Sequence, residues 1–395
     1  MDFIELEKRY FIGTYSRIPI MIDHGEGVYL FDTSGKKYLD LLAGIAVMAL
    51  GYGHPEVVNA IAEQAKKYIH LSNLYYMKPQ LELSEKLISY IGEGYKIFFA
   101  NSGSEANEGA IKLARKYFRK KGMDKKYKVI GFEDSFHGRT IATLAATWQE
   151  KYQKDYIPLM PAFKKAKFND LSSLESLIDE EVAAIIVEPI QGEGGIKNAD
   201  EKFLKGLRDI CDKYDIILIT DEIQSGMGRT GKFLAQSYAG IKGDIITLAK
   251  ALGGGLPISA FVASPKIVDA FSYGDHGTTF GGNPVAAAAS IATLDVIEKE
   301  SLIEKNTEKG ELIIKGIEIL KEKYPKIIKD VRGKGLMIGI ELFNECNDMV
   351  GAFREKGILL NCTHGNVVRL LPPYIIEKEH IDMFLNTFED ILKNS

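Results

Sequence analysis

Cysteines and long apolar runs are scarce in this chain, and each scarcity excludes a class of protein. The 395 residues include three cysteines, Cys211, Cys346 and Cys362, which lack metal-ligand spacing and leave one unpaired. We therefore expect no metal site and a reduced, cytoplasmic setting. The longest apolar stretch, residues 41–50, is too short to cross a bilayer, and the acidic start of the chain does not resemble a secretory signal. These features predict a soluble protein without membrane association.

An excess of charge of one sign is also lacking. The chain mixes 50 Lys and Arg residues with 54 Asp and Glu residues, and its net charge is -4. This balance argues against a nucleic-acid-binding stripe. There is no low-complexity linker and no internal repeat. No Gly-x-Gly-x-x-Gly opens a helix directly after a strand, so a nicotinamide-dependent dehydrogenase is disfavoured. Apolar residues are abundant, at 46% of the chain, and can build a sizeable core.

Short apolar runs alternate with amphipathic helices from about residue 80 to 280. The candidate strands are residues 96–100, 128–132, 183–187, 216–220, 244–248 and 258–263. This alternation predicts an α/β fold with a mostly parallel central sheet and helices on both faces. Outside it, the sequence predicts a hairpin around the turn at 34–37, helices at 55–68 and 284–299, and a strand at 336–342. We expect a large domain, residues 61–284, and a smaller α+β domain formed by residues 1–60 and 285–395.

The most informative residue is Lys250, which follows a predicted core strand and precedes the three glycines 253–255. Asp221 ends another apolar run, residues 216–219. An amine and an acid at strand ends suit pyridoxal phosphate (PLP) chemistry, because the amine forms a Schiff base with the aldehyde and the acid pairs with the pyridinium nitrogen. A buried Lys–Asp ion pair without a cofactor is the alternative. Several further segments favour PLP.

Two of these segments follow the strands at 96–100 and 128–132. Residues 101–108 form a Gly/Ser turn that opens a helix, where free N–H groups and the helix dipole favour a phosphate; a helix start capped by Ser104 is the alternative. Phe136 is placed to stack on a planar ring, and Arg139 offers a fork for a carboxylate. A core Phe and a surface Arg are the alternative there, and a structural role suits His137 better than a ligand role.

Other segments add polar groups near the same predicted edge. They are Glu188 and Glu193 among glycines, Ile223 and Gln224 after Asp221, Thr278 and Thr279 in a glycine-rich loop, and Arg369 in an apolar run. Ile223 is placed to cover a ring face, and Gln224 to bond the ring's phenolic oxygen. A buried arginine needs an anionic partner, from the protein or from a substrate, so a structural salt bridge stays open for Arg369. Because ligands of open α/β sheets bind at the carboxyl ends of strands, this shared placement predicts one site.

Together these residues resemble the class III (ornithine/acetylornithine type) PLP-dependent aminotransferases of fold type I, from residues 14–17 to 369–373. Segments 44–47, 136–140 and 276–284 are most similar to the acetylornithine branch of that family. The resemblance implies ping-pong transfer of an amino group from N2-acetyl-L-ornithine to 2-oxoglutarate in arginine biosynthesis. Aminotransferases of ornithine, succinylornithine, 4-aminobutyrate or carrier-bound lysine are the alternatives. A PLP-binding protein without turnover is disfavoured because Asp221 and Lys250 are both present.

The resemblance also implies roles for individual residues. The cofactor residues, besides Ile223 placed above, would be Gly103 and Ser104 at the phosphate, Phe136 on the ring, Asp221 at the ring nitrogen, Gln224 at the phenolic oxygen, the Schiff-base residue Lys250, and Thr279 at the phosphate of the neighbouring subunit. The catalytic residues would be Lys250 and Asp221. Thr279 implies a homodimer with shared active sites.

The substrate residues implied by the resemblance are Arg139, Glu193, Thr278 and Arg369. Arg139 would hold the α-carboxylate of the acylated amino acid. Arg369 would hold the α-carboxylate of glutamate, and Glu193 would neutralise Arg369 when the first substrate is bound. Met48 and Tyr52 depart from the family pattern near the expected entrance, which bears on substrate preference.

Overall fold

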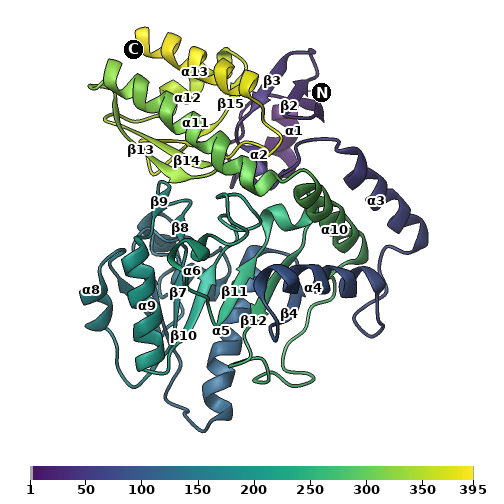
Figure 1. Cartoon of the computed structure of the whole chain (residues 1–395), viewed down its shortest axis with the longest axis vertical. Coiled ribbons are helices and arrows are strands. Elements are labelled where there is room, and N and C mark those ends of the chain that lie inside the picture. Colours follow the sequence, from purple (N-terminus) through teal and green to yellow (C-terminus); the bar gives the residue numbers. More distant parts are fainter. Residues whose placement is uncertain (1–2, 395) are drawn as a thin grey trace.

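A seven-stranded sheet forms the centre of the computed structural model, which describes residues 3–394 (Figure 1). Its strands, in spatial order, are β4 (Lys96–Ala100), β12 (Ser259–Ala263), β11 (Ile245–Leu248), β10 (Ile217–Asp221), β7 (Val182–Val187), β5 (Lys128–Phe132) and β6 (Phe163–Ala166). Only β12 runs antiparallel to its neighbours. The expected α/β fold with a mostly parallel sheet is confirmed.

The six strands expected between residues 80 and 280 all belong to this sheet. One strand of the sheet, β6, was not expected. The missed strand, β6, has the sequence FKKA and only one fully buried residue. An edge strand with two lysines carries little apolar signal, so the hydrophobic pattern does not predict it. The central strand β7, by contrast, is buried at every position and reads as a continuous apolar run.

Alternate residues of the central strands contact helices on opposite faces. Ile217 and Ile219 of β10 pack with α5 (Gly103–Lys120), whereas Leu218 packs with α9 (Glu201–Lys213). On the first face α5 approaches closely, since a Cβ at Gly109 would lie 2.3 Å from the ring of Phe261. Helices therefore cover both faces of the sheet. A ligand is expected at the carboxyl ends of the parallel strands.

Shorter helices flank the sheet and connect its strands. They are α2 (Ala43–Ala46), α3 (Pro55–Lys67), α4 (Lys78–Ile91), α6 (Ile141–Ala146), α7 (Glu150–Gln153), α8 (Leu171–Glu175), η1 (Lys154–Tyr156), η2 (Ala235–Ala239) and η3 (Lys250–Gly253). A two-stranded ribbon of β8 (Ile190–Gln191) and β9 (Lys197–Asn198) lies beside them. The alanine-rich helix α10 (Pro284–Lys299) packs against α3 and α4, and its start is capped by Asn283, which accepts from Val285 N–H.

There are two smaller sheets, and the two ends of the chain meet in the first of them. The first contains β1 (Ile22–Glu26), β2 (Tyr29–Asp32), β3 (Lys37–Asp40) and β15 (Ile358–Leu359), and the second contains β13 (Ile328–Lys334), β14 (Met337–Leu342), β17 (Val367–Leu370) and β16 (Asn361–Thr363). Helices α1 (Phe3–Tyr10), α11 (Leu302–Lys323), α12 (Asn347–Glu355) and α13 (Lys378–Lys393) accompany them. Figure 1 shows both termini at this end of the molecule. The division at residues 60/61 and 284/285 stays a prediction, and Met1, Asp2 and Ser395 lie outside the described residues.

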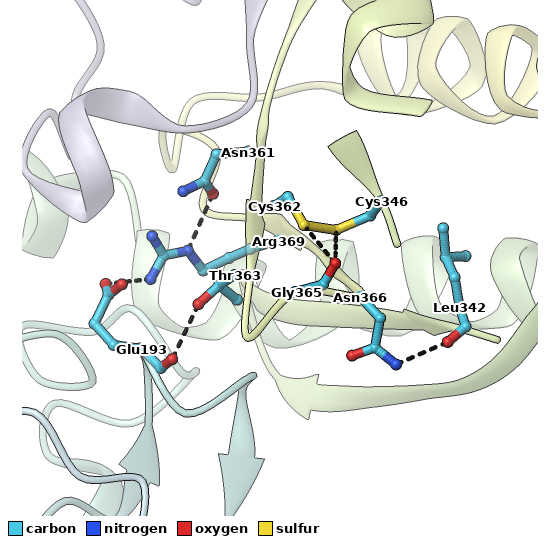
Figure 2. Close-up of a disulfide and its surroundings, with 9 residues drawn as sticks. All are labelled: Glu193, Leu342, Cys346, Asn361, Cys362, Thr363, Gly365, Asn366 and Arg369. Carbon is cyan, nitrogen blue, oxygen red and sulfur yellow. Dashed lines mark hydrogen bonds and ion pairs between the residues drawn. A yellow bond between two sulfur atoms is a disulfide. The ribbon is translucent and has the colours of Figure 1, made fainter. Parts of the chain in front are cut away.

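The expectation of reduced cysteines is wrong for two of the three. Cys346 and Cys362 form a disulfide with their Cα atoms 5.7 Å apart, and Cys211 is free and buried (Figure 2). The two residues are 16 positions apart in sequence. The chain between them runs through α12 and turns back, so that β16 contacts the start of that helix. The spacing of the two cysteines in the sequence does not show that they lie close together in the fold.

No helix within residues 3–394 is long and apolar enough to cross a membrane.

Candidate active site

A cavity of about 350 Å³ lies at the carboxyl ends of β4, β5, β10 and β11. It is lined by eight of the twelve residues expected from the sequence: Gly103, Ser104, Phe136, Glu193, Asp221, Ile223, Gln224 and Lys250. The remaining four, Arg139, Thr278, Thr279 and Arg369, are not among its lining residues. The fold therefore brings these eight residues, which follow different strands, together at one edge of the sheet.

Lys250 lies just beyond β11, in the connection from β11 to the antiparallel strand β12. Its backbone is left-handed, with φ of 47°, and Gly254 and Gly255 that follow also have positive φ. Burial lowers the pKa of its amine to about 8, although the nearby carboxylate of Glu193 opposes the shift. A lysine with this pKa has an appreciable neutral fraction near pH 7 to 8, which is the nucleophilic form.

Asp221 ends β10 and is held by two side chains that the sequence did not identify. Asn107 Nδ2 donates to its Oδ2 at 2.8 Å, and His137 Nδ1 lies 2.8 Å from the same oxygen. The backbone N–H of Ile223 donates to Oδ1 at 3.1 Å. All these groups point the carboxylate in one direction, as a partner of a cationic ring nitrogen requires. The only sequence signal for Asn107 was its place in the first turn after the Gly/Ser motif.

Two further buried acids support the loops around the cavity. Glu188 accepts from the backbone N–H groups of Phe136 (2.9 Å) and Gly192 (3.3 Å), and burial raises its pKa to about 7. Glu222 accepts from Ser225 and from the N–H groups of Ala235 and Gln236, and burial raises its pKa to about 7 as well. Both carboxyls fix backbone, and Glu188, which lines the cavity, fixes part of its wall.

The start of α5 lines the cavity through Gly103 and Ser104. The capping residue is Ser102, whose Oγ accepts from Glu105 N–H at 3.3 Å, so the alternative of a cap at Ser104 is wrong. The hydroxyl of Ser104 instead accepts from the backbone N–H of Arg139 at 3.3 Å. A Cβ at Gly103 would lie 2.9 Å from Ile223 Cδ1, so glycine is needed for the close approach of these loops. A long helix whose N-terminus opens on a cavity is a suitable anion site.

Arg369 is buried in β17, with 1% of its surface exposed, and forms an ion pair with Glu193 (Figure 2). Its Nε donates to Asn361 Oδ1 at 3.1 Å, and its Nη1 also donates to the carbonyl of Gly192 at 3.3 Å. Burial alone would raise the pKa of Glu193, but the charges of Arg369 and then Lys250 outweigh it, and the net pKa lies below its usual value. The salt bridge left open for Arg369 therefore exists, and its partner is the expected acid.

Arg139 and Thr278 lie beside the cavity wall, and Thr279 follows Thr278 in the same loop. The guanidinium of Arg139 is exposed and stacks over the rings of Tyr152 (4.0 Å) and Phe136 (5.7 Å). None of the ion pairs among residues 3–394 includes Arg139. Thr278 Oγ1 accepts from Asn101 Nδ2 at 3.0 Å, which ties it to a lining residue, whereas Thr279 is exposed.

The residues expected at the entrance contribute little to the cavity wall. The hydroxyl of Tyr52 donates to Asp40 Oδ2 at 2.6 Å, and its ring packs on Gly25, where a Cβ would lie 2.5 Å away. Neither Tyr52 nor Met48 is among the lining residues, although Met48 Sδ would meet a Cβ at Gly255 at 3.0 Å. The adjacent residue Val47 lines the cavity instead.

These side chains fit PLP. A partly neutral lysine, an oriented carboxylate and a glycine-lined helix start occupy one cavity, and Gln224 Oε1 within it is buried without a hydrogen-bond partner. No group of three or more His, Cys, Asp or Glu side chains among residues 3–394 is arranged to hold a metal ion. The donors present therefore match an organic phosphate with an aldehyde and a ring nitrogen.

The chain belongs to the class III aminotransferases, since the profile of the family "Aminotransferase class-III" matches residues 11–392. It is accordingly a PLP-dependent aminotransferase. It is 51% identical over 390 residues to the acetylornithine aminotransferase of Methanocaldococcus jannaschii, covering 99% of this chain and 98% of that protein. It is 48% identical over 384 residues to the acetylornithine aminotransferase of Aquifex aeolicus, covering 97% and 100%. Among solved structures, an ornithine aminotransferase from Toxoplasma gondii, with partial occupancy of PLP at its active site, has a TM-score of 0.94 at 32% identity over 99% of this chain and 93% of that one.

Proposed function

We propose that the chain transfers the terminal amino group of N2-acetyl-L-ornithine to 2-oxoglutarate, forming N-acetyl-L-glutamate 5-semialdehyde and L-glutamate in arginine biosynthesis. The relatives named acetylornithine aminotransferase support this substrate, at 51% and 48% identity over nearly the whole chain. The geometric observation that carries the proposal is the buried Arg369–Glu193 pair beside Lys250.

Bound PLP supplies an aldehyde and an electron-withdrawing ring that stabilises negative charge on the substrate carbon. Lys250 would hold the aldehyde carbon through Nζ and, once displaced, would use the same Nζ to carry a proton away from the substrate carbon. Asp221 would keep the ring nitrogen protonated, and Asn107 and His137 hold its carboxylate for that role. The helix start at Gly103 and Ser104 would bind the phosphate, Phe136 and Ile223 would enclose the ring, and Gln224 would contact the phenolic oxygen.

The Arg369–Glu193 pair allows one cavity to serve two substrates with different charges. 2-Oxoglutarate carries two carboxylates, and Arg369 would bind one of them after leaving Glu193, while Arg139 would bind the other. N-Acetylornithine carries one carboxylate, which Arg139 would bind while Glu193 keeps Arg369 neutralised. Thr278 would lie beside the substrate.

The spectrum of the purified enzyme tests this function. Adding N-acetylornithine without an oxoacid is expected to abolish the visible band of bound PLP, and 2-oxoglutarate is expected to restore it. If N-acetylornithine leaves the band unchanged but ornithine, succinylornithine, 4-aminobutyrate or a lysine derivative abolishes it, that compound is the amino donor instead. Parallel initial-rate lines are expected for the ping-pong scheme, and intersecting lines would contradict it.

We also propose a homodimer with shared active sites. Thr279 lies in a loop that contacts residues 69–76, because Asn73 Nδ2 donates to the carbonyl of Gly281 at 3.1 Å. Around this contact large apolar side chains are exposed, including Leu74 at 84%, Tyr76 at 94% and Phe280 at 58%. Exposed apolar patches of this kind are typical of subunit interfaces. This placement supports a role for Thr279 at the phosphate site of a second subunit.

Mixing two inactive variants tests the shared site. If Thr279 serves the partner, a heterodimer of Lys250→Ala and Thr279→Ala subunits contains one complete site and regains activity. If Thr279 serves its own subunit, the mixture stays inactive. A monomer in sedimentation would overturn the dimer altogether.

We place the enzyme in the cytoplasm and its site between the two proposed domains, 61–284 on one side and 1–60 with 285–395 on the other. Glu193 comes from the first part and Arg369 from the second. The low cysteine content supports a cytoplasmic location, whereas the Cys346–Cys362 disulfide argues against a strongly reducing one. Cell fractionation distinguishes these settings.

A further inference from the structure

Strand β16 has one face toward the active site and the other toward the disulfide. It pairs antiparallel with β17, with Asn361 opposite Arg369 and Thr363 opposite Val367. Because side chains alternate along a strand, Asn361 and Thr363 share one face and Cys362 takes the other. Figure 2 shows Asn361 and Thr363 directed toward the Arg369–Glu193 pair, and Cys362 directed away from it toward Cys346.

On the active-site face, β16 holds both members of the ion pair. Asn361 Oδ1 accepts from Arg369 Nε at 3.1 Å, and Thr363 Oγ1 donates to the backbone carbonyl of Glu193 at 3.0 Å. The acceptor of the Arg369 Nε–H is the neutral amide oxygen of Asn361. This bond leaves the two Nη groups of the guanidinium available for a carboxylate. It therefore persists whether Arg369 faces Glu193 or a substrate carboxylate, and it fixes the guanidinium plane in both states.

On the other face, the disulfide cross-links a short edge strand to the segment before α12. β16 has three residues and lies at the edge of its sheet, so it has a backbone ladder on one side only. Cys362 ties it to Cys346, directly before α12, and the backbone N–H of Cys346 donates to the carbonyl of Gly365 at 3.2 Å. Without the cross-link, a short edge strand has few contacts that keep its register.

We propose that Asn361 is a positioning residue that holds Arg369 for dicarboxylate substrates, and that the Cys346–Cys362 disulfide makes this positioning sensitive to thiol reductants. The proposal rests on the proposed function, because it assigns the dicarboxylate to Arg369. The half-reaction with 2-oxoglutarate depends on the free guanidinium, whereas the half-reaction with N-acetylornithine leaves it paired with Glu193. Loosening β16 therefore weakens the first half-reaction more than the second.

The redox step is a two-electron exchange with a dithiol. A thiolate of the reductant attacks one sulfur, the Sγ–Sγ bond breaks, and the second thiol of the reductant completes the exchange. Cys346 and Cys362 gain one hydrogen each, and the dithiol leaves as a cyclic disulfide. Cys211 is buried and takes no part.

The first test compares Asn361→Ala, Asn361→Gln and the control Asn366→Ala in the two half-reactions, followed by the visible band. Asn366 lies in the same hairpin but donates to the carbonyl of Leu342 at 2.9 Å, away from Arg369. Loss of a hydrogen bond to a charged group predicts an about ten- to hundredfold weaker apparent affinity of Asn361→Ala for 2-oxoglutarate. N-Acetylornithine is expected to change less than about twofold in that variant, Asn361→Gln to recover part of the loss, and Asn366→Ala to leave the ratio unchanged. Equal losses in both half-reactions would overturn the positioning role.

The second test treats the holoenzyme with dithiothreitol, removes the reagent without air, and counts thiols by alkylation and mass. Two new thiols should accompany a weaker apparent affinity for 2-oxoglutarate, by about two- to tenfold, at unchanged N-acetylornithine kinetics. The Cys346→Ser/Cys362→Ser variant should start at the weaker affinity and not respond to the reagent. Two new thiols with no change in the wild type would overturn the redox sensitivity, even if the double variant failed to fold. If the wild type ignores N-acetylornithine altogether, the proposed function fails, and the same ratio is then measured with whichever amino donor responds.

Discussion

The centre and the rim of this cavity are held in different ways. Lys250 and Asp221, at the centre, extend from β11 and β10, in which every residue is buried. Arg369 comes from β17 of another sheet, in which every residue is buried as well, whereas Arg139 comes from an exposed loop. The centre is thus positioned by the central sheet, whereas the rim, Arg369 and Arg139, is positioned by a second sheet and a loop. This difference separates the chemistry, common to all substrates, from the choice of substrate.

Lys250→Ala is expected to have the largest effect, because it removes both the covalent attachment and the proton carrier. Turnover should fall by about 10⁴-fold with every amino donor, and added PLP should give no protein-linked visible band. Lys205→Ala, an exposed position on α9, serves as the control. Retained activity of Lys250→Ala would show that Lys250 is not the catalytic amine.

Asp221→Ala should be the next most severe change, at about 10²- to 10³-fold in turnover, since it removes a buried charge aimed at the reacting system. Its signature should be an equal loss in both half-reactions, because the ring nitrogen is needed in each. Stopped-flow decay of the visible band with each substrate measures this. A loss of turnover confined to one substrate would mean that Asp221 acts on substrate choice and not on the ring nitrogen.

Arg369→Ala should separate the two half-reactions. We expect an about 100-fold weaker apparent affinity for 2-oxoglutarate, since a buried charged contact is lost, and a much smaller change for N-acetylornithine. Glu193→Gln sharpens the comparison, because it frees Arg369 and should weaken the use of N-acetylornithine. Parallel losses for both substrates would count against a switch between Arg369 partners.

The smallest effect is a pH dependence of cofactor uptake by the apoenzyme. The pKa of Lys250 is lowered by burial to about 8, so the neutral amine becomes more abundant as the pH rises toward that value. The rate at which the visible band returns after PLP addition should rise about tenfold per pH unit below 8 and level off above it. A rate that keeps rising to pH 10 would mean that the amine is not desolvated before the cofactor binds.

The sequence predicted the reacting residues better than the residues that hold them in place, for a physical reason. Lys250 and Asp221 were identifiable because each lies within two residues of the end of an apolar run, and the strands carry such residues to one edge. The partners of Asp221 were not, since Asn107 and His137 come from distant segments whose contact depends on packing. The same applies to Asn361 and Thr363, and to the disulfide, because cross-strand contacts leave no mark in sequence spacing.

The antiparallel strand β12 sets a limit on how this fold can vary. Lys250 lies in the connection 249–258 between two directly paired strands, with Leu248 opposite Ala260. A chain that returns through a helical crossover can absorb inserted residues by lengthening the helix, but this connection has no such slack. Insertions or new chain ends placed here would displace the lysine, so natural variation in length and engineered circular permutation should be confined to the other connections of the sheet.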